Sequence, residues 1–196
     1  TEVENKTSFI KQWQILNSQL NASNASPMLR QEYDRTQSIL GALLGLHWNG
    51  SLYEQLDGEL RHENTITAVK VWLFAQCCLH PTALVLEDGH WLDDASHEVL
   101  TAICQEMTDY PLLILITSRY LDNGHHPEFK LATHPPLLKI DLKTLSPSSL
   151  RQQIEQILNG PINDNFFTLL QERTQANPFF SQQMIYYFQE NQLLIR

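Results

Sequence analysis

The chain has 196 residues, enough for one large domain or for a domain with a small appendage, and it can bury a sizeable core. Its formal charge of -9, from 13 Lys and Arg against 22 Asp and Glu, argues against direct nucleic-acid binding, because that binding depends on clustered cations. A hydrophobic content of 42% excludes a disordered tail, and the apolar runs are far shorter than the ~20 residues of a membrane span, so we expect no membrane partner.

The cysteines indicate the redox environment of the chain, and its first residues indicate whether it is part of a larger protein. Three cysteines without CxxC spacing predict neither a disulfide framework nor a zinc knuckle, and they fit a reducing, cytoplasmic environment. Residue 1 is Thr rather than Met and leads directly into polar sequence. We therefore expect an internal piece of a larger cytoplasmic protein.

Residues 1–80 show a helical pattern. Apolar side chains recur at heptad-like spacing near both ends of this segment, at Phe9, Trp13, Leu16 and Leu20 and again at Ile66, Val69, Leu73 and Cys77. Turn-forming residues at 21–27 and 47–50 separate the predicted helices. We expect this part to be entirely α-helical.

The spacing of the apolar residues changes in segment 81–143. The apolar runs 83–86 and 112–117 have the length of strands buried on both faces, and the sequence between them predicts a helix capped by Asp93 or Asp94. A strand, a helix and a strand in this order predict a βαβ unit with a parallel sheet. A third short strand is predicted over residues 137–142.

The last segment, 144–196, predicts three helices. Their starts are marked by Ser146-Pro147, by Asn163 or Asp164, and by Asn177-Pro178. In the last of these helices we expect the inward-facing side chains to be Phe180, Met184 and Phe188. The segment therefore predicts a separate helical subdomain.

Two acidic residues, Glu87 and Asp88, directly follow the first predicted strand. Open α/β sheets bind their ligands at the carboxyl ends of the strands, and Mg²⁺ prefers oxygen ligands. Because side chains alternate along a strand, one carboxylate can hold Mg²⁺ through water while the other orients or deprotonates an attacking water. The alternative is that a strand simply ends in a polar loop.

Segment 81–96 combines a hydrophobic strand, the two acids, a spacer and the pair His90-Trp91. It resembles the Walker B signature of STAND-type AAA+ ATPases of the P-loop NTPase superfamily, modules found beside cyclase domains, in LuxR-like regulators and in large sensor kinases. Further pieces follow in family order: 114–119 resembles the sensor 1 strand, 145–150 the lid entry, and 173–180 the lid helix. The resemblance covers about residues 36 to 195.

The resemblance implies an α/β fold with an incomplete parallel-sheet P-loop NTPase core. Residues 1–80 would form a helical insert, residues 81–143 the α/β part of the core, and residues 144–196 the helical lid. Ala176 stands where the family has a glycine, so the close backbone approach that a glycine permits is not expected there.

The resemblance also implies roles for individual residues. Glu87 would bind Mg²⁺, Asp88 would activate water, and Arg119 would act catalytically on the γ-phosphate from the end of the neighbouring strand. The cofactor-binding positions would be Thr117, Ser118 and Pro178. Two purely structural interpretations remain open: Arg119 marks the end of a strand, and Pro178 is the first residue of a helix.

ATP and Mg²⁺ are the implied cofactors, and the implied function is a nucleotide-dependent signalling switch. Its partners would be other domains of a larger multidomain signalling protein, with self-association left open. A phosphate-binding loop needs glycines and a lysine, yet the sequence contains no Gly-Lys pair. Either that loop precedes Thr1 or it has been lost, so we expect weak nucleotide binding here and hydrolysis only in the complete protein.

Two other functions compete with this interpretation. One is a non-catalytic regulatory module that keeps the fold without hydrolysis. The other is a metallophosphoesterase, because Asp88-Gly-His90 matches the opening motif of that class and three more ligand candidates follow at Asp93, Asp94 and His97. The later histidine motifs of that class are missing from the sequence.

Overall fold

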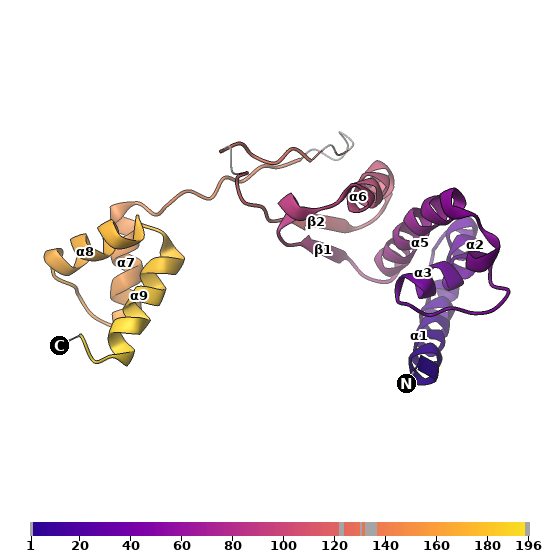
Figure 1. The fold of residues 1–196 in the computed structure, drawn as a ribbon, viewed down its shortest axis with the longest axis horizontal. Coiled ribbons are helices and arrows are strands. Elements are labelled where there is room, and N and C mark those ends of the chain that lie inside the picture. The colour runs from indigo at the N-terminus through magenta and orange to yellow at the C-terminus, as the bar shows by residue number, and fades with distance from the viewer. Residues whose placement is uncertain (1, 122–123, 130, 132–136, 195–196) are drawn as a thin grey trace. The chain divides into compact units, whose positions relative to one another are not determined.

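The computed structural model describes residues 2–121, 124–129, 131 and 137–194, and 64% of it is helical. The chain divides into two compact units, Thr1–Leu137 and Leu138–Arg196 (Figure 1). Each unit has its own hydrophobic core and is described by itself.

The described residues up to Leu79 are helical, as predicted. The helices are α1 (Glu2–Ala22), α2 (Pro27–Arg35), α3 (Gln37–Leu43), α4 (Leu52–Gln55) and α5 (Gly58–Leu79). Side-chain caps set two of the starts: Ser26 accepts a hydrogen bond from the Leu29 N–H before α2, and Asp57 accepts one from the Leu60 N–H before α5. These caps satisfy N–H groups that have no partner inside a helix.

An aromatic stack holds α1 against α2. The rings of Trp13 and Tyr33 are stacked with centroids 4.0 Å apart, and Tyr33 is fully buried. The Tyr33 hydroxyl donates to the Trp13 carbonyl at 3.5 Å, which gives the buried phenol a polar partner. The stack forms one end of the core that continues through α5 to the sheet.

The strands follow the helical part. In chain order the elements are β1 (Thr82–Leu86), the 3-10 turn η1 (Gly89–Trp91), α6 (Asp94–Glu106), the 3-10 turn η2 (Met107–Asp109) and β2 (Leu112–Ile116). β1 and β2 pair in parallel, with Thr82 opposite Leu112 and Leu86 opposite Ile116. The two predicted strands and their parallel pairing are therefore confirmed, and Asp93 caps α6 by accepting from the Ser96 N–H.

The predicted P-loop NTPase core is wrong for this chain as the structure describes it. The sheet formed by the described residues has two strands, within a mostly helical chain. Residues 137–142, predicted as a third strand, lie in no strand, and Leu138, Ile140 and Leu142 are exposed. An alternating apolar pattern forms a strand only when it joins a ladder of backbone hydrogen bonds, and residues 137–142 are not part of the sheet that the described residues form.

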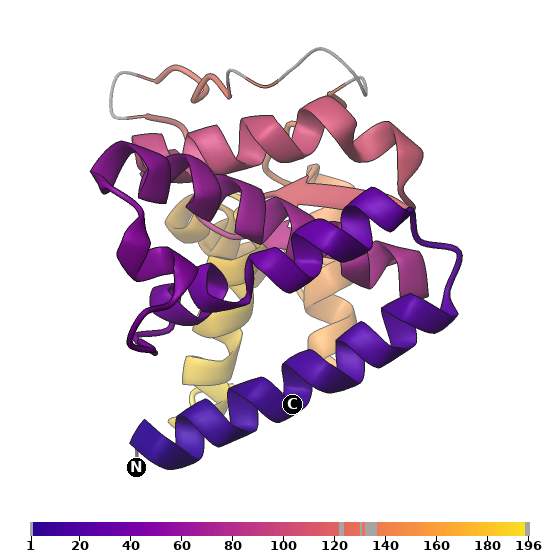
Figure 2. The same ribbon diagram turned by 90° about the vertical axis from the view of Figure 1, so that its right-hand side faces the viewer.

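The sheet is covered on one face. Leu84, Leu86, Ile114 and their neighbours pack against the core formed with α5 and α6, which lie alongside each other (Figure 2). The other face carries Val85 and Leu115, which are 53% and 50% exposed. The prediction that both faces of the strands are buried is therefore wrong.

The second unit contains the three predicted helices, α7 (Pro147–Leu158), α8 (Asp164–Thr174) and α9 (Pro178–Glu190). Ser146, Asn163 and Asn177 cap them as expected. The inward face of α9 differs from the prediction, because Phe180 is 58% exposed while Ser181 and Ile185 are fully buried. Phe180 lies one residue before the i, i+4 pair Ser181 and Ile185 that faces the core, whereas Met184 and Phe188 are partly buried against that core as predicted.

Candidate functional site at the carboxyl ends of the strands

Two backbone hydrogen bonds extend the contact between the strands beyond their ends. The Thr117 N–H donates to the Leu86 carbonyl at 2.9 Å, and the Gly89 N–H donates to the Thr117 carbonyl at 2.7 Å. The segment after β1 is thus fastened to the segment after β2. This holds Glu87 and Asp88 beside Thr117, at the sheet edge where a parallel α/β arrangement places its ligands.

Asp88 makes the contacts that join the two segments. Its carboxylate Oδ1 lies 3.9 Å from the Arg119 Nε and 4.0 Å from the His90 Nδ1. Its backbone N–H donates to the Thr117 Oγ1 at 3.4 Å. Because the Arg119 side chain is 82% exposed, its attraction to Asp88 is screened by water and contributes only about 0–1 kcal/mol.

The backbone at Asp88 is left-handed, with φ of 53°. This conformation costs a residue with a Cβ roughly 1–2 kcal/mol, although Asp and Asn adopt it more readily than most. The left-handed residue ends the strand geometry and starts η1, in which the Trp91 N–H donates to the Asp88 carbonyl. The turn directs the chain from β1 toward the cap of α6.

Glu87 lies on the exposed face of the sheet. Exposure alternates along β1, and Glu87 is exposed like Val85 two residues before it. Thr117 is exposed in the same way and follows Leu115 on β2. Glu87 and Thr117 therefore form the carboxyl-end border of the uncovered apolar face.

His90 is a site residue whose contacts the sequence did not reveal. Its Nδ1 accepts a hydrogen bond from the Arg119 backbone N–H at 3.4 Å, and its side chain is only 11% exposed. The ring lies 5.1 Å from that of Trp91, which is itself 78% exposed. The His-Trp pair was the available signal, but a contact with Arg119, 29 residues further along the chain, depends on the parallel pairing of the strands.

The remaining predicted cofactor positions are less closely tied to this edge. Ser118 is exposed, and its hydroxyl donates to the Arg119 carbonyl at 3.2 Å. Pro178 belongs to the second unit, where it is the first residue of α9. The structure therefore brings Asp88, Thr117 and Arg119 together in one unit and places Pro178 in the other.

The chemistry of the edge fits a weak Mg²⁺ site. Mg²⁺ in proteins keeps several waters and takes one or two carboxylates, and Glu87 and Asp88 supply two hard oxygen donors. Within the described ranges, no group of three or more His, Cys, Asp or Glu side chains is placed to hold a metal ion. The Arg119 and His90 nitrogens near Asp88 compete with a cation for that carboxylate.

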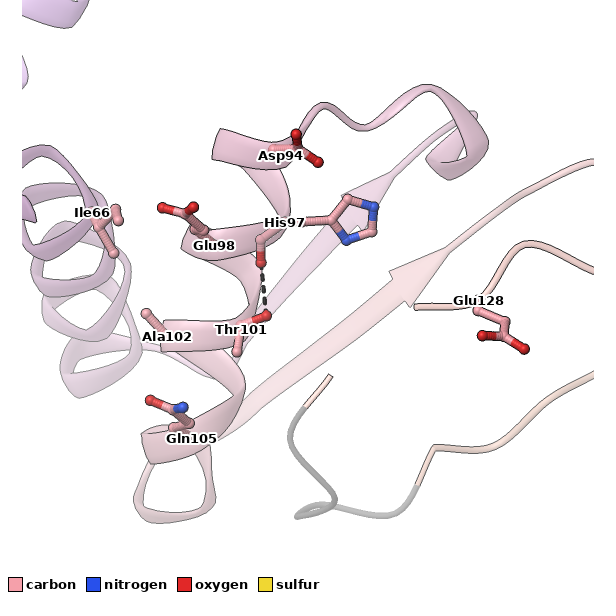
Figure 3. A pocket seen from close by; sticks show the side chains of 8 residues that line it. All are labelled: Ile66, Asp94, His97, Glu98, Thr101, Ala102, Gln105 and Glu128. Carbon is pink, nitrogen blue, oxygen red and sulfur yellow. Dashed lines mark hydrogen bonds between the residues drawn. The ribbon is translucent and has the colours of Figure 1, made fainter. Parts of the chain in front are cut away.

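A hollow lies away from this edge, beside α6. A cavity of about 650 Å³ is lined there by Ile66, Asp94, His97, Glu98, Thr101, Ala102, Gln105 and Glu128 (Figure 3). Figure 3 shows Glu128 on a separate segment opposite the helix. Asp94 and His97, two ligand candidates of the metallophosphoesterase alternative, line this cavity, whereas none of the six predicted site residues does.

No protein-family model, curated protein or solved structure matches this chain. Across the part of the chain that the structure describes, no helix has both the length and the apolar character needed to cross a membrane. The functional assignment therefore depends on the residues and contacts at the β1–β2 edge.

Proposed function

We propose that the β1–β2 edge is the Mg²⁺ and phosphate contact of a cytoplasmic, ATP-dependent signalling switch. The observation that carries the proposal is the Asp88–Arg119 pair, an acid and a cation 3.9 Å apart at the ends of adjacent parallel strands. Nucleotide phosphates bound with Mg²⁺ need both kinds of group, a carboxylate for the metal and a cation for the phosphate oxygens.

Each residue at the edge has a role in this proposal. Glu87, which is exposed at the border of the sheet, holds the metal through water, and Asp88 orients or deprotonates the attacking water. Arg119 and the hydroxyls of Thr117 and Ser118 contact phosphate oxygens. Bound Mg²⁺ would supply neutralisation of the phosphate charge.

The proposed switch acts on other domains of a larger signalling protein. A nucleotide can shift a conformational equilibrium only by binding one state more tightly than another. Asp88 and Arg119 follow different strands, so a phosphate group inserted between them would replace their mutual contact by contacts with ligand. ATP hydrolysis belongs to the complete protein in this proposal, because the sequence contains no phosphate-binding loop.

A second candidate function is a non-catalytic regulatory module. The specific observation that favours it is the internal pairing of Asp88, whose carboxylate faces Arg119 and His90. In this alternative the pair holds the two strand ends together and the edge takes no nucleotide. The module would then act through protein contacts alone.

Mn²⁺ is a suitable probe for the Mg²⁺ site because it binds the same oxygen ligands and broadens nearby NMR signals. We expect substoichiometric Mn²⁺ to broaden the amide signals of Glu87, Asp88 and Thr117 first, and excess Mg²⁺ to restore them. The Arg119 signal should broaden with them, because Arg119 contacts Asp88, and ATP added with Mn²⁺ should deepen the broadening there. Glu87→Gln combined with Asp88→Asn should abolish the effect, whereas Glu54→Gln, which changes an acid on α4, should leave it intact.

The same titration separates the two candidate functions. Mn²⁺ broadening at the edge that ATP does not alter favours the non-catalytic module with an incidental cation site. Broadening that is spread evenly over acidic residues, or that persists in the Glu87 and Asp88 double variant, contradicts the proposed site.

A further inference from the structure

The hydrogen bonds that join the two strands change their pattern where β1 ends. The Thr117 N–H donates to the Leu86 carbonyl at 2.9 Å. In a parallel ladder the next such bond, two residues further along each strand, would join the Arg119 N–H to the Asp88 carbonyl. The left-handed turn at Asp88 instead directs this carbonyl to the Trp91 N–H at 2.9 Å. The Arg119 N–H therefore needs a different acceptor.

Side chains take over as acceptors at this point. The Asp88 N–H donates to the Thr117 hydroxyl oxygen at 3.4 Å. The Arg119 N–H donates to the His90 Nδ1, also at 3.4 Å, so the imidazole stands in for the carbonyl that the ladder has lost. The His90 side chain is only 11% exposed, and packing therefore restricts the positions that this acceptor can take.

The contact defines which nitrogen of the His90 ring carries the proton. A ring nitrogen that accepts a hydrogen bond has no proton of its own, so the neutral ring has its N–H at Nε2. The same Nδ1 atom lies 4.0 Å from the Asp88 Oδ1, which in turn lies 3.9 Å from the Arg119 Nε. One ring nitrogen is therefore close to both members of the Asp88–Arg119 pair.

We propose that His90 is a positioning residue that keeps the Arg119 backbone in the register of β2 beyond the end of the strand, so that the guanidinium is presented beside Asp88. The consequence for phosphate binding rests on the proposed function of Arg119. Because the Arg119 side chain is 82% exposed, its surroundings restrain it little, and the fixed backbone N–H limits where the guanidinium can go.

Two substitutions separate the acceptor atom from the bulk of the ring. In His90→Asn the amide oxygen lies near the place of Nδ1 and can accept the same hydrogen bond, whereas in His90→Gln the amide lies one carbon further out, near the place of Nε2. Hydrogen exchange of the Arg119 amide, followed by NMR, reports this bond. We expect exchange about fivefold faster in His90→Gln and close to the original rate in His90→Asn. The Leu84 amide within β1 is the internal reference for the fold and should exchange at the same rate in both variants.

Inorganic tripolyphosphate with Mg²⁺ is the probe for the consequence at the site, and its affinity is measured by calorimetry on the full chain. His90→Gln should weaken binding by about threefold to tenfold, and His90→Asn should restore most of the loss. In an Arg119→Gln background, His90→Gln should cause no further loss, because His90 acts through Arg119. His47→Gln, which changes an exposed histidine away from the edge, should leave both the affinity and the Arg119 exchange rate unchanged.

An unchanged exchange rate of the Arg119 amide in His90→Gln, or equal effects of Asn and Gln, would overturn the positioning role. A His90 ring with its proton on Nδ1, seen in long-range ¹H–¹⁵N spectra, would overturn it as well. If exchange follows the prediction while all variants bind tripolyphosphate equally, the link from His90 to phosphate is wrong although the proposed function stands. If the unmodified chain binds no tripolyphosphate, the proposed function fails, and the exchange rates still decide whether His90 holds the Arg119 backbone.

Discussion

Gly89 lies so close to Ile116 that a Cβ atom at residue 89 would come within 2.5 Å of the Ile116 Cγ2. The same atom would lie 3.0 Å from the ring of Phe129. Gly89 also donates its N–H to the Thr117 carbonyl, so the backbone cannot retreat without losing that hydrogen bond. We expect Gly89→Ala to lower the free energy of unfolding by about 1–3 kcal/mol, measured by urea denaturation.

Gly58→Ala is the matched control. A Cβ at Gly58 meets no atom within 4 Å, and the residue is the first of α5, where Ala is a better helix former than Gly. This change should be neutral or should stabilise the protein by up to about 1 kcal/mol. A loss in Gly58→Ala as large as that in Gly89→Ala would contradict the steric explanation.

Because the backbone at Asp88 is left-handed, two substitutions can separate the conformational role of this residue from its chemical role. Asp88→Gly and Asp88→Ala both remove the carboxylate, but only Gly adopts φ of 53° without steric cost. We expect the Gly variant to be more stable than the Ala variant by about 1 kcal/mol in urea denaturation. Both should lose the Mn²⁺ broadening at the edge to the same extent.

Equal stability of the two Asp88 variants would show that the turn relaxes when the side chain changes. Asp88→Asn serves as the intermediate case, because Asn tolerates the left-handed region while losing the negative charge. Its stability should lie close to that of the unmodified chain.

Local signals explain what the sequence predicted about the fold. The N-caps Asp93, Ser146, Asn163 and Asn177 act within three residues, and the apolar runs of β1 and β2 are continuous, so each element is specified by its own residues. Coverage of a sheet depends on segments that are distant in the chain. The sequence around Val85 and Leu115 cannot tell whether a second layer is present, and residues 137–142 alternate like a strand although they belong to none in the described structure.

The candidate site likewise combines residues that the sequence indicates with contacts that only the fold creates. Glu87 and Asp88 were visible because two acids directly follow an apolar run, whereas Arg119, which follows the next such run, was implied by the family resemblance. The contact of His90 with the Arg119 backbone and the left-handed Asp88 follow from the register of the strands and from the turn, which single residue types do not encode. Pro178 was chosen by resemblance alone, and it lies in the other unit.

The end of α8 offers a stabilising substitution. Gln175 follows the helix with φ of 52°, is exposed, and donates its N–H to the Gln171 carbonyl, the arrangement in which glycine is preferred. Gln175→Gly should raise the free energy of unfolding of the second unit by about 0.5–1 kcal/mol, measured by thermal or urea denaturation.

Gln183→Gly provides the comparison, since Gln183 is exposed in the middle of α9. There the same substitution should destabilise by about 0.5–1 kcal/mol, because glycine is disfavoured in a helix interior. The two substitutions should therefore change the free energy of unfolding in opposite directions. A loss of stability at both positions would refute the helix-end argument. Ala176→Gly is predicted to be nearly neutral, because relief of its φ of 56° is offset by loss of a buried methyl group.

Buried phenol and thiol groups predict a loss of stability at alkaline pH. Burial raises the pKa of Tyr33 well above its usual range, and it also raises the pKa of the partly buried Tyr110. Burial raises the pKa of the three thiols as well, those of Cys77, Cys78 and Cys104. All five groups thus stay neutral in the folded chain at pH values where they ionise in the unfolded chain, near 8.5 for thiols and 10 for phenols.

A folded-state pKa above the unfolded value means that this stability is complete below the unfolded pKa and is lost as pH rises toward the folded one. The free energy of unfolding should therefore be level from pH 6 to 8, decline from about pH 8.5, and decline more steeply above pH 10. Tyr33 alone contributes up to about 1.4 kcal/mol per pH unit above 10. Urea denaturation at pH 7, 9 and 10.5 under reducing conditions measures the profile, and Tyr33→Phe should flatten its upper part. An unchanged slope above pH 10 in Tyr33→Phe would mean that the buried phenol is not the cause, because the change removes only the ionisable hydroxyl and its 3.5 Å hydrogen bond to the Trp13 carbonyl.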